Sequence, residues 1–186
     1  MSIFILGLIL FFAVHSFVAF FRKQRDNLIA RIGEWPFKGV YSLISLAGFV
    51  MIIMGWPDAD ATALYVTPPY LRHITYALMA VAMILLVAAY APAGRIAAAV
   101  KHPMLAGVKI WAFAHLLVNG EVRSILLFGA FLVFAVGDRI AVKRRNAPTP
   151  VAGPVRNDII AIVIGLAAYA LIALTLHRSI AGVALF

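Results

Sequence analysis

Six apolar segments dominate the sequence and limit the folds open to it. Most have 17 to 19 residues, close to the roughly 20 that a helix needs to cross a hydrocarbon core of about 30 Å. The chain is 65% hydrophobic and only 12% charged, whereas a soluble domain is about half apolar and about a quarter charged. The predicted fold is therefore an all-α, polytopic integral membrane bundle of about six transmembrane helices. It forms a single domain over residues 1–186.

Proline and polar residues set the bounds of these segments. Pro57 and Pro92 stop the second and third segments, whereas Pro103 is a favourable first residue for the fourth. The fourth segment is the shortest and most polar, which predicts a place inside the bundle. The predicted spans are 3–21, 39–56, 73–90, 103–119, 124–142 and 158–176. A short interfacial helix over 95–102 and a flexible connection over 147–154 are also expected.

The basic residues alternate between the two sides of the predicted bundle. Twelve of the 16 Lys and Arg residues fall in the first, third and fifth loops, three fall on the other side, and Lys109 lies within a span. Cytoplasmic loops carry the excess of basic residues, so both termini are predicted to lie outside. The net charge of +9 then reflects topology and not nucleic-acid binding, and the expected partner is the lipid bilayer. The twelve are Arg22, Lys23, Arg25, Arg31, Lys38, Arg95, Lys101, Arg139, Lys143, Arg144, Arg145 and Arg156.

Residue types and spacings add three further predictions. The chain has no cysteine, which excludes disulfides, thiolate ligands and cysteine nucleophiles. Small residues at Ala161/Gly165 and Ser45/Gly48 would let helices approach closely. Asp138 and Arg139 close the fifth span and are expected to form an interfacial ion pair.

Two of the five histidines lie inside apolar spans. His73, His102 and His177 sit at predicted membrane boundaries, where a polar tip can reach the headgroups without any special function. His15 and His115 lie within helices, where ionisable residues are rare and usually face the bundle interior. They could make interhelical hydrogen bonds, or they could hold a heme iron from both faces. No carboxylate lies at membrane depth beside them, which disfavours an open metal site.

Depth and neighbouring residues refine the heme hypothesis. At 1.5 Å per residue, His15 lies roughly 10 Å and His115 roughly 18 Å from the cytoplasmic boundary, an offset of roughly 8 Å. Lys109 precedes His115 by six positions and could either snorkel to the headgroups or pair with a heme propionate. Asn119, one turn after His115, could be a helix cap or a polar neighbour of the site.

Four stretches carry a resemblance to a known family: LGLILFFAVHS (6–16), RIGEWPFKGVYSLISLAG (31–48), KHPMLAGVKIWAFAHLLVNG (101–120) and LLFGAFLVFAVGDR (126–139). Together these stretches resemble the NnrU family of bacterial membrane proteins. The resemblance implies a bacterial cytoplasmic (inner) membrane location. It also implies a link to denitrification, around nitrite and nitric oxide reduction, with respiratory or denitrification proteins as candidate partners.

The NnrU family is similar in turn to the zeta-carotene isomerase of plants and cyanobacteria, a heme b membrane enzyme. In that enzyme, a histidine followed by serine resembles His15, and a histidine after Trp–Cys–Leu–Ala resembles His115, which follows Trp111 by four positions. The resemblance implies heme b as cofactor with His15 and His115 as iron ligands. Ala112 stands where the isomerase carries a cysteine linked to iron ligation, so a switch to thiolate ligation is not available and carotene isomerisation is disfavoured.

The predicted function is that of a heme b protein with a redox, sensing or isomerase-like role, its site formed by His15, His115, Lys109, Trp111 and Asn119. Six-coordinate iron suits electron transfer or redox sensing. One alternative is a small membrane transferase or reductase, because the His102–Pro103–x–x–x–Gly107 run is similar to a motif of isoprenylcysteine methyltransferases and some lipid reductases. Another is a non-enzymatic assembly or transport factor for respiratory complexes. Whether the protein is an enzyme stays open at this point.

Overall fold

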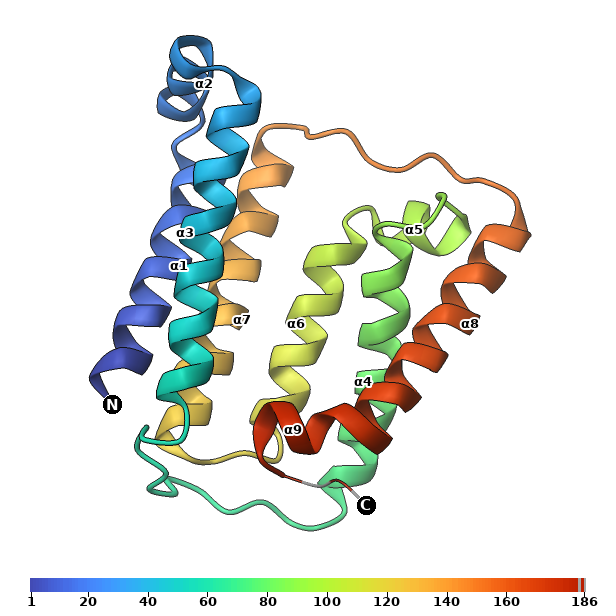
Figure 1. Ribbon diagram of the computed structural model, residues 1–186. Coiled ribbons are helices and arrows are strands. Elements are labelled where there is room, and N and C mark those ends of the chain that lie inside the picture. Colours follow the sequence, from blue (N-terminus) through green and yellow to red (C-terminus); the bar gives the residue numbers. More distant parts are fainter. Residues whose placement is uncertain (184, 186) are drawn as a thin grey trace.

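The computed structural model describes residues 1–183 and 185, and it is built from helices (Figure 1). The all-α prediction is confirmed, since the described residues contain an isolated β-bridge but no strand. The elements are α1 (Ser2–Phe20), α2 (Arg22–Ile32), α3 (Glu34–Gly55), α4 (Leu71–Ala88), α5 (Arg95–Val100), α6 (Pro103–Leu116), α7 (Val122–Arg144), α8 (Val155–Leu171), the π-turn η1 (Ile172–Leu176) and α9 (His177–Ala181).

Within the described residues, five helical segments are long and apolar enough to cross a membrane: α1, α3, α4, α7, and the segment Val155–Ala181 that begins with α8. Large apolar side chains on them face outward, including Leu43 (69% exposed), Val133 (73%) and Leu174 (68%). Burying such side chains in lipid is favourable, whereas exposing them to water is not. The chain is therefore a multi-pass membrane protein.

The fourth predicted span is shorter than expected. Helix α6 has 14 residues, or about 21 Å at 1.5 Å per residue, less than the roughly 30 Å of a hydrocarbon core. The structure thus supports five spans, not all of the six predicted. Helix α6 packs between α4 and α7, which agrees with its predicted place inside the bundle.

The bundle helices pack in the order α3, α1, α7, α6, α4 and α8. The start of α1 and the end of α9 lie at the same end of the molecule (Figure 1). The amino group of Met1 donates a hydrogen bond to the Asp58 carbonyl, 2.9 Å away, in the connection between α3 and α4. The helices α2 and α5 and the connection between α7 and α8 lie at the opposite end (Figure 1), where the sequence places most basic residues.

The first basic loop is more ordered than predicted. It contains the helix α2, and α3 begins at Glu34, five residues earlier than residue 39. Helix α2 is polar on most positions, so apolar periodicity could not reveal it. Gly33, with φ of 90°, separates the two helices, and the Glu34–Lys38 ion pair of 2.7 Å supports the added first turn of α3.

The last predicted span is not one straight helix. Helix α8 ends at Leu171, and the π-turn η1 leads into α9, which runs across the bundle end instead of along α8 (Figure 1). Within the turn, the Thr175 hydroxyl donates a hydrogen bond to the Leu171 carbonyl at 2.5 Å. A π-turn and a hydroxyl that inserts into the helical ladder are recognised causes of helix bending.

Small residues allow close helix contacts, as predicted. A Cβ atom added at Gly48 would lie 2.8 Å from the backbone nitrogen of Phe11 on α1. One added at Gly165 would lie 2.7 Å from the Cα atom of Ile84 on α4. Both distances are shorter than a side chain tolerates, so glycine is required for these backbones to touch.

The predicted ion pair between Asp138 and Arg139 is wrong. Asp138 instead lies 3.8 Å from Arg145, seven residues later, at the C-cap of α7. Consecutive residues on an α-helix point about 100° apart, whereas residues seven apart return to the same face.

The short predicted helix 95–102 is present as α5, and a carboxylate from another helix caps it. The two oxygens of Asp158 accept hydrogen bonds from the backbone N–H groups of Arg95 (3.0 Å) and Ile96 (2.9 Å). Asp158 is buried, with 9% exposed, and lies at the start of α8. This contact fixes the α8 end against the connection between α4 and α5.

Replacing Asp158 by alanine is expected to lower the free energy of unfolding by about 1–2 kcal/mol, because two N–H groups lose their acceptors. Asp158→Asn keeps one carboxamide oxygen as an acceptor, so its free energy of unfolding should fall less. The thermal unfolding midpoint in detergent measures both changes. An alanine variant as stable as the parent protein would show that the cap contributes nothing.

Candidate functional site

Helix α7 joins the two helices that carry the membrane histidines, since both α1 and α6 pack on it. Phe128, Phe131 and Phe134 recur every third residue along α7 and line one face. The Phe131 ring lies 4.9 Å from Phe12 of α1 and 5.1 Å from Trp111 of α6, between ring centroids. The three helices therefore share one aromatic cluster.

His15 lies half-buried among rings from three helices. Its imidazole stacks on Phe11, with centroids 4.0 Å apart, and also contacts Tyr41 of α3 (5.4 Å) and Phe134 of α7 (5.9 Å). Its Nδ1 atom lies 2.7 Å from the Phe11 carbonyl oxygen. Because a carbonyl only accepts hydrogen bonds, Nδ1 is the donor, and in the neutral ring Nε2 keeps its lone pair.

His115 repeats the arrangement on α6. Nδ1–H donates to the carbonyl of Trp111 at 2.8 Å, and the imidazole stacks on Phe128 with centroids 4.4 Å apart. Both Nδ1 hydrogen bonds run to the carbonyl four residues earlier in the same helix. Among the described residues, neither imidazole makes an interhelical hydrogen bond, and neither Nε2 atom has a hydrogen-bond partner.

The two histidines lie at different heights in the bundle. His15 contacts Phe134 and His115 contacts Phe128, and these phenylalanines are six residues apart on α7. At 1.5 Å per residue the difference in height is about 9 Å along α7, close to the offset of roughly 8 Å predicted from depth. Phe131 lies between the two levels.

The other predicted site residues take separate roles. The Trp111 carbonyl holds His115, and its ring packs edge-on against Phe128 at 5.0 Å. The Asn119 side chain donates to the His115 carbonyl at 2.8 Å, so Asn119 caps the end of α6. Lys109 forms no ion pair among the described residues and lies about 9 Å from His115 along α6, toward the basic end.

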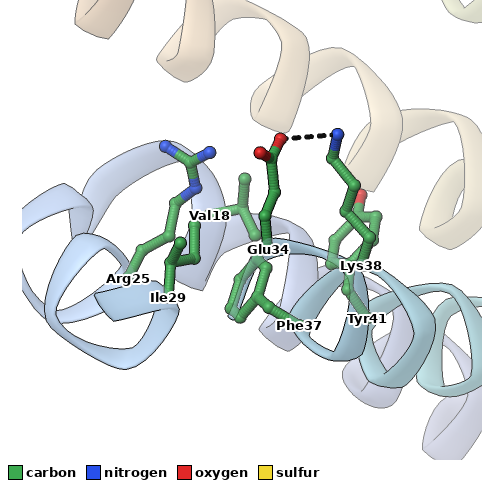
Figure 2. Close-up of a pocket in the computed structure, with 7 residues that line it drawn as sticks. All are labelled: Val18, Arg25, Ile29, Glu34, Phe37, Lys38 and Tyr41. Atoms are coloured by element: carbon green, nitrogen blue, oxygen red, sulfur yellow. Dashed lines mark ion pairs between the residues drawn. The ribbon is translucent and has the colours of Figure 1, made fainter. Parts of the chain in front are cut away.

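A cavity of 210 Å³ lies between α1, α2 and α3 at the basic end of the bundle. Its lining residues are Val18, Arg25, Ile29, Glu34, Phe37, Lys38 and Tyr41, as Figure 2 shows. Tyr41 lines this cavity and also contacts the His15 ring. The cations of the cavity are paired, Lys38 with Glu34 at 2.7 Å and Arg25 with Asp26 at 3.1 Å.

Comparison with known proteins identifies the family. The family model described as NnrU protein matches residues 3–185. The chain belongs to the NnrU family. No curated protein and no solved structure matches the chain. The match confirms the resemblance seen in four stretches of the sequence, and both membrane histidines lie within it.

The His102–Pro103–x–x–x–Gly107 run of this NnrU protein has a packing role. Pro103 opens α6, and a Cβ atom at Gly107 would lie 3.1 Å from the Ala82 carbonyl oxygen on α4. The pKa of His102 lies below its usual value, because partial burial and the nearby guanidinium of Arg139 disfavour the imidazolium. The motif therefore fixes the contact between α4 and α6.

Apart from Trp111, the aromatic residues around the histidines were not predicted from the sequence. The phenylalanines of α7 carried a signal, since their spacing of three places them on one helix face. Tyr41 of the NnrU chain carried no such signal, because nothing in the sequence around it shows which helix α3 packs against. Its contact with His15 follows only from the packing of α3 on α1.

Proposed function

We propose that this NnrU protein binds heme b, with Nε2 of His15 and Nε2 of His115 as the iron ligands. The observation that carries the proposal is the state of these two imidazoles. Each has its Nδ1–H tied to a backbone carbonyl, which is how metal-ligating histidines are oriented and made more basic. Each therefore offers one unoccupied lone pair inside an apolar helix bundle.

The surroundings of the two histidines suit a porphyrin. A heme iron needs at most two protein ligands, because the porphyrin nitrogens fill the other four positions, and helix bundles hold such groups between facing helices. The Phe11 ring stacks on His15 and the Phe128 ring stacks on His115, so both imidazoles lie in apolar surroundings. Lys109 is a cation available to a propionate, and Asn119 and Trp111 fix the backbone and ring of His115.

A heme held by both His15 and His115 would supply electron-transfer or redox-sensing chemistry. Ala112, one residue after Trp111, is fully buried, and alanine offers no thiol to an iron at this position. The resemblance stated above supports a role in the bacterial cytoplasmic membrane alongside respiratory or denitrification proteins, which would exchange electrons with the heme.

An absorption spectrum tests the proposal directly. The full chain is purified in mild detergent from heme-replete cells and its spectrum is recorded oxidised and reduced. We expect a Soret band, the sharp reduced bands of low-spin heme b, and about one heme per chain. A protein that is colourless after expression with sufficient heme would reject heme binding and leave the histidines as packing groups.

A further inference from the structure

A second hollow lies at the basic end of the bundle, between the ends of α1 and α7 and on the other side of α1 from the cavity of Figure 2. Its volume is 360 Å³. We call it the arginine hollow. Its lining residues are Ala19, Phe20, Arg22, Gly137, Ile140, Ala141, Arg144 and Arg145.

Three guanidinium groups line the arginine hollow, and no carboxylate is among the lining residues. Arg145 already has two partners: its guanidinium lies 3.8 Å from the Asp138 carboxylate and donates a hydrogen bond to the Ala19 carbonyl at 3.4 Å. Arg22 and Arg144 form no ion pair or side-chain hydrogen bond with any described residue. This contrasts with the cavity of Figure 2, where each cation already has a carboxylate partner.

The remaining wall of the hollow is apolar and open to the surroundings. Phe20 is 45% and Ile140 is 47% exposed. Gly137 keeps the space between them free, because a Cβ atom there would lie 3.3 Å from the end of the Phe20 ring. A ligand that fits must therefore be anionic at one end and apolar at the other.

We propose that the arginine hollow binds an anionic phospholipid. Arg22, Arg144 and Arg145 receive the phosphate, since guanidinium groups match phosphate oxygens with paired hydrogen bonds. The first part of an acyl chain lies against Phe20, Gly137 and Ile140. Basic pockets between membrane helices on the cytoplasmic side are known to take anionic headgroups. The site lies apart from the histidines, so this proposal does not depend on heme.

Binding is tested on the full chain in detergent by native mass spectrometry with phosphatidylglycerol, which is anionic, and phosphatidylcholine, which is zwitterionic. The wild-type protein should prefer phosphatidylglycerol. The double variant Arg22→Gln/Arg144→Gln should bind it about 30-fold more weakly at low salt, from the usual contribution of two basic residues near a membrane surface. The matched control Arg95→Gln/Arg156→Gln makes the same change of charge at the same end, outside the hollow, and should retain the preference.

Gly137→Leu leaves every charge in place but fills the apolar part of the hollow. It should lose the bound lipid while it remains folded by size-exclusion chromatography. Equal binding of the two lipids by the wild-type protein would overturn the proposal. An equal loss of binding in the control double variant would also overturn it, because the effect would then come from overall charge. Full competition by inorganic phosphate would overturn it too, because the site would then bind a free anion and not a lipid.

Discussion

Replacing His115 or His15 by alanine is expected to remove most of the heme that we propose this NnrU protein binds. Each imidazole offers its Nε2 because Nδ1–H is tied to the carbonyl of Trp111 or Phe11. Removing a residue that only hydrogen-bonds to a metal ligand typically lowers the affinity for the metal about 10- to 100-fold. Removing the ligand itself should lower the affinity at least as much. The ratio of Soret to protein absorbance after purification measures the loss.

Two other histidines provide matched controls for this experiment. His73 contacts only the Tyr76 ring at 6.4 Å among the rings described, and His73→Ala should keep its heme. His177 also has Nδ1–H tied to a carbonyl, that of Val183 at 2.8 Å. If His177→Ala removed the heme and His15→Ala did not, the assignment of His15 as a ligand would be wrong. Added imidazole should restore the spectrum of a variant that has lost only a ligand.

Replacing Gly48 by leucine is expected to destabilise the protein by about 3 kcal/mol, the upper part of the range for overpacked sites. The helices α1 and α3 cross at three glycines, and each glycine lies against the backbone of the other helix. A Cβ atom added at Gly48 would lie 2.8 Å from the Phe11 backbone nitrogen, and one added at Gly7 would lie 2.7 Å from the Ile52 backbone nitrogen. A Cβ atom at Gly55 would lie still closer to the backbone of Phe4. A side chain at Gly48 must push the two helices apart, because backbone atoms cannot turn aside as side chains can.

The same helix supplies the control. Gly39 is also on α3, and a Cβ atom there would meet nothing within 4 Å. Gly39→Leu should therefore be neutral or stabilise by about 0.5–1 kcal/mol, since glycine is a poor helix former. Thermal unfolding in detergent measures both variants. Equal unfolding midpoints for the Gly48 and Gly39 variants would show that the close crossing is not required for stability.

The Gly48 variant also bears on the candidate site. Tyr41 of α3 contacts the His15 ring at 5.4 Å, seven residues before Gly48 and on the same helix face. Separating α1 from α3 should therefore disturb the surroundings of His15 while leaving those of His115 on α6 intact. Heme content measured on the same sample would report this separately from stability.

Much of the candidate site was visible in the sequence. Ionisable residues are rare within apolar helices, which is why His15 and His115 could be selected without a structure. Their difference in height also followed from helix geometry, at roughly 8 Å by counting residues and about 9 Å from their neighbours on α7. The phenylalanine rings that surround them could not be selected, because phenylalanine is common throughout these spans.

The sequence by itself determined that the chain is helical and that it lies in a membrane. In hydrocarbon each backbone group must be satisfied within its own helix, so length and apolarity are sufficient evidence for a span. Only the tertiary structure decided that α6 ends at Leu116, that Asp138 faces Arg145, that α9 turns away at a π-turn and that Tyr41 reaches His15. Those features depend on how each helix is rotated against its neighbours, and helices that are apolar on most sides do not encode that rotation in their periodicity.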